Sequence, residues 1–265
     1  KLFPYFENGK LSMNFGFGID ITQIIFAERE REKIMHSMTV QNEELKQFAY
    51  ITTHDLKEPL RMIHGFSQLL RRKNEKILSS ESLEFIDYVI TSSNHMTKLI
   101  DDLLAYSKVG LHLTTATKVN LQDVLEIVES SIDLEEEVVC MTYQNLPTLK
   151  VHASLMMQLF RNLIENAIKF RQKNETVKIN LSAKEQKDTY LFTITDNGIG
   201  IPEAKQTLIF EAFSRLHSKS EYPGSGIGLA TCKKILEIYG GNIWVSSKLN
   251  EGSTFYFTLP KTNDN

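Results

Sequence analysis

In the N-terminal half of the chain, five residues recur at the spacing that is typical of the contact face, or seam, of a coiled coil. Within a highly charged stretch that begins near Ala27, these positions follow one another alternately four and three residues apart: Ile34, Met38, Gln41, Leu45 and Phe48. A helix with this period buries a narrow stripe against a parallel partner. The spacing therefore predicts a coiled coil between two copies of the chain over residues 27–48.

The apolar pattern continues beyond this seam and predicts a helical hairpin. It runs on to Leu70, stops at the polar stretch RRKNEK (71–76) and resumes from Leu83 to Tyr106. Each of the two helices carries an apolar stripe too broad for one neighbour, so pairing two hairpins into a four-helix bundle would bury it. We therefore predict that the chain forms a homodimer.

The first residues predict a two-stranded hairpin. Two alternating segments, Phe3–Phe6 and Leu11–Ile19, flank the dipeptide Asn8-Gly9, which favours the positive φ angles of a tight turn. The segment Gly16–Thr22 resembles the last strand of a PAS sensory domain, and this resemblance implies that the hairpin is the tail of such a domain. A plain N-terminal hairpin is the alternative.

After Gly110 the sequence mixes helical segments with alternating strands. The predicted helices are Asp123–Ser131, Ser154–Phe170 and Gly226–Tyr239, and the predicted strands are Val177–Ala183, Tyr190–Thr195, Asn242–Ser247 and Thr254–Leu259. Strands paired mainly antiparallel with helices between them predict an α/β sandwich, in which helices cover one face of a mixed sheet. The fold class is thus multidomain, α followed by α+β.

Composition excludes several classes of function. The net charge of -3 provides no basic surplus for nucleic acid or anionic lipid. No apolar run approaches the roughly 18 residues that span a bilayer, so we expect no membrane contact within the chain, although a membrane segment upstream of Lys1 is left open. Cys140 and Cys232 lie far apart and match no paired metal spacing, which favours a reducing, cytoplasmic setting.

The first chemical signal is a histidine followed directly by an acidic residue. His54 precedes Asp55 and lies five positions before Pro59. It also lies nine residues beyond the seam residue Leu45, which at about 100° per residue places it on the opposite, solvent-facing side of the helix. A largely neutral imidazole can act as a nucleophile, and a neighbouring carboxylate fixes its tautomer. The alternative is a solvated histidine beside a solvated aspartate.

The segment RNLIENAIKF, Arg161–Phe170, predicts a polar face on a helix. Asn162 and Asn166 are one turn apart, and Lys169 lies close to the same face. Amide oxygens together with phosphates and water suit magnesium, so Asn166 is the candidate metal ligand. Solvated asparagines are the alternative.

The segment DNGIGIP, Asp196–Pro202, follows a predicted strand. The Asp196 carboxylate only accepts hydrogen bonds when ionised, which suits the exocyclic amine of adenine. Gly198 and Gly200 would let the backbone come close to a flat base. A structural turn is the alternative.

The segment PGSGIGLA, Pro223–Ala230, opens a predicted helix with a glycine-rich turn. Gly224, Gly226 and Gly228 would expose backbone N–H groups at the positive end of the helix dipole, where phosphates bind.

A polar stretch, Ser214–Tyr222, separates the two glycine segments and follows Phe210 and Phe213. We interpret it as a mobile lid hinged on these aromatic anchors, with Arg215 placed to contact the terminal phosphate.

Taken in order, these segments resemble the catalytic core of sensor histidine kinases over roughly Glu43–Pro260. Such cores join a phospho-acceptor histidine box to the Bergerat-type ATP-binding domain that is shared with gyrase and heat-shock protein 90. The resemblance implies an asparagine box, an adenine box, a phenylalanine box and a phosphate loop: Asn162, Asn166 and Lys169; Asp196, Gly198 and Gly200; Phe210 and Phe213; Gly224, Gly226 and Gly228.

The same resemblance implies an activity. ATP and Mg²⁺ would be the cofactors, His54 the phosphorylated residue, Asp55 and Arg215 its assistants, and a response-regulator receiver domain the partner. The expected domains are a PAS-like tail, a signalling coiled coil, a dimerisation and phosphotransfer hairpin and an ATP-binding domain: residues 1–26, 27–48, 49–112 and 117–261.

Two rival functions and one departure from the family pattern accompany this expectation. A gyrase-type ATPase would need Glu165 to activate water and would leave the His54 box unexplained, and a degenerate kinase would act as a dimeric scaffold without binding ATP. Many related kinases carry threonine or asparagine four positions after the histidine, where this chain has Glu58. We therefore expect a good kinase and a poor phosphatase of its regulator.

Overall fold

The computed structural model describes most of the chain in two units. The described residues are 2–16, 25–26, 29–31, 33, 55–110, 115–132, 139–173, 175–215, 222 and 224–261. The two units are Lys1–Phe48 and Ala49–Asn265. The predicted coiled-coil seam from Ile34 to Phe48 and the candidate nucleophile His54 lie outside the described residues.

The N-terminal unit contains the predicted hairpin. Strands β1 (Leu2–Glu7) and β2 (Lys10–Gly16) pair antiparallel. Asn8 and Gly9 connect them with φ angles of 51° and 79°, as expected for a turn with two positive φ values. The resemblance to a PAS strand depends mainly on residues 17–22, which are outside the described ranges, so a PAS-like tail stays a prediction.

The second unit begins with a helical hairpin. Residues 55–74 are helical, and after a short turn α2 runs from Ser80 to Lys108. The Ser79 hydroxyl caps α2 by accepting a hydrogen bond from the backbone N–H of Ser82 at 3.2 Å. Two ion pairs, Lys57–Asp101 and Arg71–Asp87, join the helices and show that they run antiparallel. The predicted hairpin is therefore confirmed.

The α/β part of this unit is built on a five-stranded sheet. Its strand order is β4-β6-β7-β9-β8, and only the pair β4–β6 is parallel. The strands are β4 (Val139–Gln144), β6 (Val177–Glu185), β7 (Thr189–Asp196), β8 (Ile243–Lys248) and β9 (Gly252–Pro260). Two further strands, β3 (Thr117–Asn120) and β5 (Thr148–Val151), pair antiparallel beside it. The mixed, mainly antiparallel sheet was predicted, whereas β3, β4 and β5 were not.

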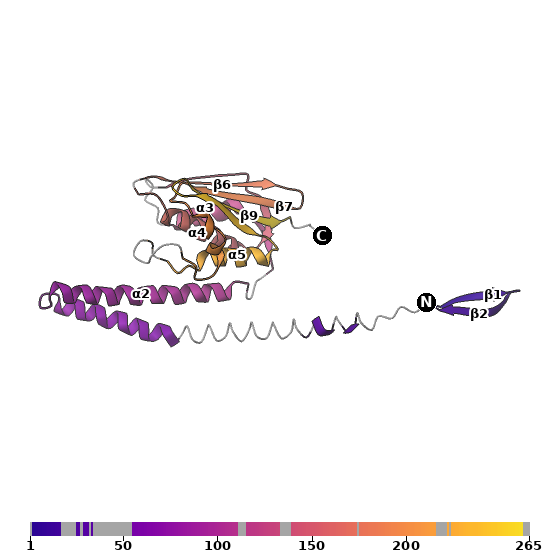
Figure 1. Ribbon diagram of the computed structural model, residues 1–265, viewed down its shortest axis with the longest axis horizontal. Helices are drawn as coiled ribbons and strands as arrows, with labels where there is room; N and C mark the ends of the chain where they lie inside the picture. Colours follow the sequence, from indigo (N-terminus) through magenta and orange to yellow (C-terminus); the bar gives the residue numbers. More distant parts are fainter. Residues whose placement is uncertain are drawn as a thin grey trace. The chain divides into compact units, whose positions relative to one another are not determined.

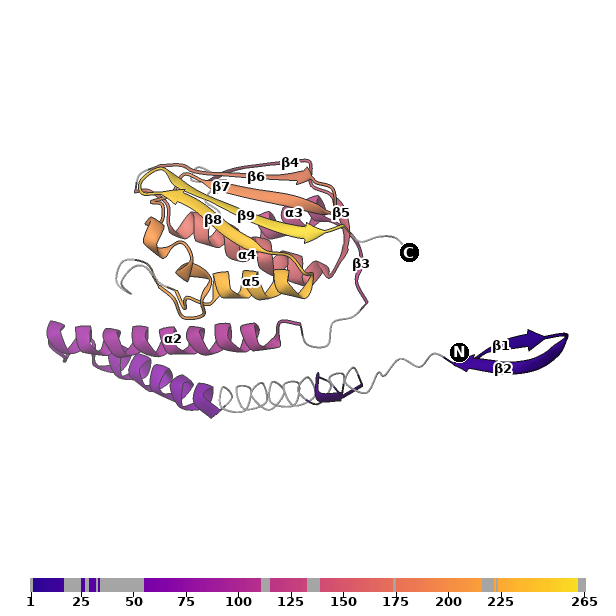
Figure 2. The ribbon, with the colours of Figure 1, turned by 45° about the vertical axis from the view of Figure 1, so that its right-hand side comes forward.

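Three helices cover one face of this sheet, as Figures 1 and 2 show. They are α3 (Leu121–Ser131), α4 (Ala153–Lys169) and α5 (Gly228–Ile238). Two short 3-10 helices, η1 (Glu203–Lys205) and η2 (Leu208–Phe210), lie between β7 and α5 in the chain.

The core lies between these helices and the sheet. Phe192 of β7 stacks on Phe257 of β9 with ring centroids 4.6 Å apart, and Phe160 of α4 packs against Phe257 at 6.3 Å. All three side chains are fully buried. Since burying one such side chain contributes about 1.5–3 kcal/mol, these contacts fix α4 against the sheet. Within the ranges described above, no helix is long and apolar enough to cross a membrane.

Candidate functional site

A cavity of about 250 Å³ opens beside α4, the loop after β7 and the start of α5. Most of the residues that the sequence singled out line it: Asn162, Asn166, Lys169, Asp196, Gly200, Arg215, Gly224, Gly226 and Gly228. These residues come from segments that are far apart along the chain, and only the packing of α4 and α5 on the sheet brings them together.

The polar face of α4 forms one wall of this cavity. The opposite face of the helix is apolar and buried, which orients Asn162 and Asn166 together toward the opening. Asn162 donates a hydrogen bond from Nδ2 to the backbone carbonyl of Gly228 at 3.2 Å, so that α4 is tied to the first turn of α5. The predicted common face of the two asparagines is confirmed.

Asp196 lies at the end of β7 with only 8% of its surface exposed. Its Oδ1 accepts hydrogen bonds from the backbone N–H groups of Gly198 at 2.8 Å and Ser253 at 3.2 Å. Burial raises the pKa of the Asp196 carboxyl group. The two hydrogen bonds act in the opposite direction, but the effect of burial is larger. With Oδ1 held by the backbone, Oδ2 is the oxygen that can accept a hydrogen bond from a ligand in the cavity.

Two glycines of the site lie close to the protein's own backbone. Gly200 has a φ of +73°, and a Cβ atom there would lie 2.1 Å from the backbone oxygen of Lys248. Gly226 has a φ of +75°, and its Cβ would lie 2.7 Å from the backbone oxygen of Ser214. Both positions therefore need glycine because the protein's own backbone passes close by. The close approach of a flat base at Gly200 and the binding of phosphates at Gly226 stay predictions.

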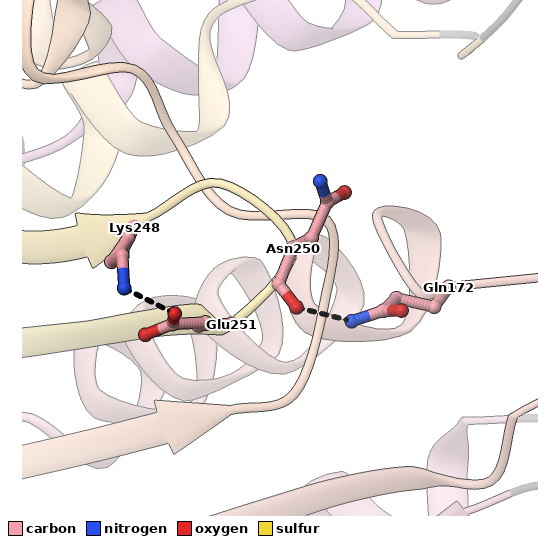
Figure 3. A network of polar contacts seen from close by, with 4 residues as sticks. All are labelled: Gln172, Lys248, Asn250 and Glu251. Atoms are coloured by element: carbon pink, nitrogen blue, oxygen red, sulfur yellow. Dashed lines mark hydrogen bonds and ion pairs between the residues drawn. The ribbon is translucent and has the colours of Figure 1, made fainter.

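Gln172, which follows α4, connects the loop after β7 to the turn between β8 and β9. Its Nε2 group donates to the backbone oxygens of Asn250 at 3.0 Å and of Asn197 and Gly198, both at 3.3 Å. Figure 3 shows the amide reaching the Asn250 carbonyl in the β8–β9 turn. The sequence contains no periodicity or motif that would single out Gln172, because its acceptors are backbone atoms of distant segments.

We expect Gln172→Ala to weaken nucleotide binding while the fold persists. The loop that carries Asp196 would lose hydrogen bonds worth about 0.5–1.5 kcal/mol each, which corresponds to roughly 2- to 12-fold in affinity. Calorimetric titration with a non-hydrolysable ATP analogue measures this loss. Lys173→Ala, which changes the exposed neighbour, is the control and should bind normally. Unaltered affinity in the Gln172 variant would contradict this role.

Among the described residues, three cations line the cavity: Lys169 of α4, Arg215 after η2, and Lys98 of α2. Burial lowers the pKa of Lys169, and the charges of Arg215 and Lys98 lower it further. Lys169 Nζ also lies beside Gly224, because a Cβ on that glycine would be 2.4 Å away. Lys169 and Arg215 thus lie beside the glycine segment that opens α5, where the positive end of the helix dipole adds to their field.

The aromatic pair before the lid segment behaves differently from the prediction. Phe210 is buried and packs edge-on against Phe255 at 6.4 Å. Phe213 is 57% exposed and has a φ of +65°, so it is not an anchor in this structure. Neither ring lines the cavity, and neither does Gly198. The backbone N–H of Phe213 donates a hydrogen bond to the carbonyl of Gly226 at 3.0 Å.

The phospho-acceptor segment is only partly described. Asp55 is the first described residue of its helix and is exposed, as is Glu58 one turn later. Neither of them lines the cavity. Side chains that do line it, and that the sequence did not reveal, include Lys98, Asp102, Gln158, Tyr222 and Ser253.

Comparison with protein families gives two adjacent matches. Residues 44–111 match the family described as His Kinase A (phospho-acceptor) domain. Residues 152–263 match the family described as Histidine kinase-, DNA gyrase B-, and HSP90-like ATPase.

Several curated proteins are similar to this chain. Cyanobacterial phytochrome A of Nostoc sp. is 42% identical over 236 residues, which are 87% of this chain and 30% of the relative. The phytochrome-like protein Cph1 of Synechocystis sp. is 37% identical over 245 residues, 92% of this chain and 33% of the relative. The chain therefore spans about a third of the length of the curated relatives it matches.

Solved structures share the fold. Full-length ShkA in complex with AMPPNP aligns with a TM-score of 0.59 and 23% identity over 81% of this chain and 45% of that chain. The Acinetobacter baumannii histidine kinase AdeS aligns with a TM-score of 0.55 and 20% identity over 79% of this chain and 98% of that chain.

Proposed function

The chain belongs to the sensor histidine kinases, as a catalytic core with a phospho-acceptor domain and a histidine kinase-type ATPase domain, and on this premise we propose that it phosphorylates its own His54 from ATP. The observation that carries the proposal is the single cavity lined by Asn166, Asp196 and the glycine segment that opens α5. That cavity offers an acceptor for an adenine amine at one position and cations for phosphates at another. We keep residues 49–112 and 117–261 as the two catalytic domains.

In this proposal the residues act mainly by positioning and by charge. Oδ2 of Asp196 accepts a hydrogen bond from the adenine amine, while Lys169, Arg215 and the first backbone N–H groups of α5 balance the phosphates. A ring nitrogen of His54 then forms a bond to the γ-phosphorus as the bond to the bridging oxygen breaks. ADP leaves, and Asp55 orients the ring and takes up its proton.

The donor set suits magnesium. Asn162, Glu165 and Asn166 line the cavity with amide and carboxylate oxygens, and Asn166 would hold the ion. Among the described residues no group of three His, Cys, Asp or Glu side chains could hold a metal, so the remaining ligands would be phosphate oxygens and water. Bound magnesium would neutralise charge on the phosphates.

The proposed acceptor of the phosphoryl group is an aspartate on a response-regulator receiver domain. The family assignment supports this partner because phosphohistidine transfer to such a domain is the general mechanism of two-component systems. One observation favours the alternative function, a gyrase-type ATPase: Glu165 lines the same cavity and could activate water.

Incubation with γ-labelled ATP and magnesium separates these two activities. A histidine kinase retains label on the protein in a phosphoramidate, which acid destroys and alkali preserves. An ATPase releases the label as free phosphate and leaves the protein unlabelled. Absence of protein-bound label with rapid phosphate release would contradict the proposed kinase activity.

We further expect a homodimer formed through the helical hairpin. Large apolar side chains on the hairpin are exposed in a single chain, among them Phe66 at 69% and Phe85 at 59%. Burial of such side chains against a second hairpin would drive association. Light scattering should therefore give twice the 30.4 kDa mass of one chain.

Charged substitutions test where the dimer forms. Phe66→Glu and Phe85→Glu should yield monomers, because each would bury an unpaired carboxylate in the interface. Ile127→Glu is the matched control, since Ile127 is 54% exposed on α3, outside the hairpin. A monomer mass for the unmodified chain would overturn the prediction.

Glu58 predicts weak phosphatase activity toward the regulator. It is exposed and follows His54 by four residues, so an ionised carboxylate would stand one helical turn from the phosphoryl group. Its negative charge repels the phosphate of an incoming regulator. The phosphorylated partner should lose label no faster with the chain than without it, and Glu58→Asn should accelerate the loss several-fold. Glu75→Asn in the hairpin turn is the control, and rapid dephosphorylation by the unmodified chain would refute the idea.

A further inference from the structure

The cavity has a wall that does not belong to the ATPase domain. Lys98, Asp102 and Ala105 of α2 line it. Residues spaced by four and three positions lie on one face of a helix, so this face of α2 is turned toward the cavity. The hairpin therefore contributes side chains to the nucleotide site.

The contact between α2 and α5 holds this wall in place. Lys234 of α5 donates a hydrogen bond from Nζ to the backbone oxygen of Tyr106 at 2.7 Å and lies 4.5 Å above the centre of its ring. Val109, directly after α2, is 5% exposed and belongs to the domain core. Gly110 follows, and a Cβ atom there would lie 3.0 Å from Ile238. The C-terminal part of α2 is thus packed on α5.

The neighbouring face of α2 contacts the phospho-acceptor helix. Asp101 forms an ion pair with Lys57, which lies three residues after His54 in the sequence, in the helix described from residue 55. The next residue, Asp102, lines the cavity. Asp101 thus contacts the phospho-acceptor helix, whereas its neighbour Asp102 lines the cavity of the ATPase domain.

The charge of Lys98 is placed where phosphates would bind. Lys98 lines the same cavity as Lys169 and Arg215 and acts electrostatically on Lys169. Three like charges around one opening repel each other, and an anion that enters between them relieves that repulsion. Asp102 and Glu165 also line the cavity, and their carboxylates are of the type that a divalent cation accompanying the phosphates prefers.

We propose that Lys98 of the hairpin contacts the terminal phosphate of bound ATP, so that the nucleotide bridges α2 and the ATPase domain. The inference rests on the proposed ATP binding. It makes Lys98 a residue that distinguishes ATP from ADP, because ADP lacks the γ-phosphate that Lys98 would contact. It also links the packing of the two domains to the nucleotide that is bound, and transfer of the terminal phosphate loosens that link.

Calorimetric titrations of the full chain with magnesium test the proposal. The probes are ADP and an ATP analogue with a non-hydrolysable β–γ bridge. We expect Lys98→Ala to weaken binding of the analogue about tenfold, as expected for the loss of a hydrogen bond to a charged group. Binding of ADP should weaken less than about threefold. Lys98→Arg should retain the preference for the analogue. Lys73→Ala, at an exposed lysine elsewhere on the hairpin, should bind both as the unmodified chain does.

Hydrogen exchange provides a second readout. The analogue should slow amide exchange in the C-terminal half of α2 in the unmodified chain, more than ADP does, and Lys98→Ala should remove the difference. Because Lys98 is exposed and alanine is a good helix former, this variant should fold. Equal losses for the two nucleotides, or no loss, would overturn the proposal. Failure of the unmodified chain to bind either nucleotide would instead contradict the proposed function.

Discussion

Replacement of His54 by glutamine is expected to abolish protein-bound label from γ-labelled ATP while nucleotide affinity stays near normal. A carboxamide nitrogen is not nucleophilic, because its lone pair is delocalised, so no phosphorus–nitrogen bond can form at this position. Affinity is retained because the cavity residues that would bind the nucleotide, among them Asp196 and Lys169, belong to the ATPase domain. Autoradiography after alkaline treatment measures the first quantity, and calorimetry measures the second.

A second histidine of the hairpin supplies the control for this experiment. His64 lies on the helix described over residues 55–74 and is partly buried, with its Nδ1 atom 3.4 Å from the Ser93 hydroxyl. Glutamine there can keep a hydrogen bond to the hydroxyl, so His64→Gln should label as the unmodified chain does. Persistent label in the His54 variant would show that another residue is the nucleophile.

The substitution Asp196→Asn should weaken nucleotide binding by about 1.5–3 kcal/mol, or roughly 10- to 150-fold. The backbone N–H groups of Gly198 and Ser253 need an acceptor, which the asparagine Oδ1 can supply in place of the carboxylate. The asparagine Nδ2 then occupies the position of Oδ2. It is a donor, and it would face the amine donor of adenine.

The surroundings of Asp196 also predict that the Asp196→Asn variant loses nucleotide affinity without losing stability. Burial raises the pKa of Asp196, which means that the folded state disfavours its charge, so a neutral asparagine should not lower the free energy of unfolding. Thermal denaturation of the variant checks this point. Asp188→Asn, at an exposed position before β7, is the control for binding. Unchanged calorimetric affinity in Asp196→Asn would remove Asp196 from the adenine site.

Helix periodicity and short local motifs were sufficient for much of the molecule. The apolar stripes indicated the two helices of the hairpin, and the alternation of Phe255, Phe257 and Leu259 matches the buried positions of β9. Asn162 and Asn166 share a face because one turn of any α-helix separates them. Features of this kind depend on residues close together in the chain, and so they are readable from the sequence.

Other features depend on which segments meet in space. Strand β4 pairs parallel with β6, although no local pattern distinguishes an edge strand from a loop when the segment is short. Position 200 requires glycine because the Lys248 carbonyl passes beside it, and the backbone of Phe213 is hydrogen-bonded to the remote Gly226. The local motifs contain no sign of these contacts, because the partner atoms belong to distant segments.

The sequence by itself indicated the helical hairpin, the mixed, mainly antiparallel sheet and, through its resemblance to a known family, the sensor histidine kinases, because helices, strands and motifs are encoded in residues close together in the chain. Only the tertiary structure showed that Gln172 hydrogen-bonds to the backbone of the segment after Asp196 and that Lys98 of α2 lines the cavity. These two residues lie on segments that are remote in sequence from the groups they serve. Packing of the helices and of the β8–β9 turn brings Gln172 and Lys98 close to these groups. A contact of this kind leaves no periodic pattern in the sequence.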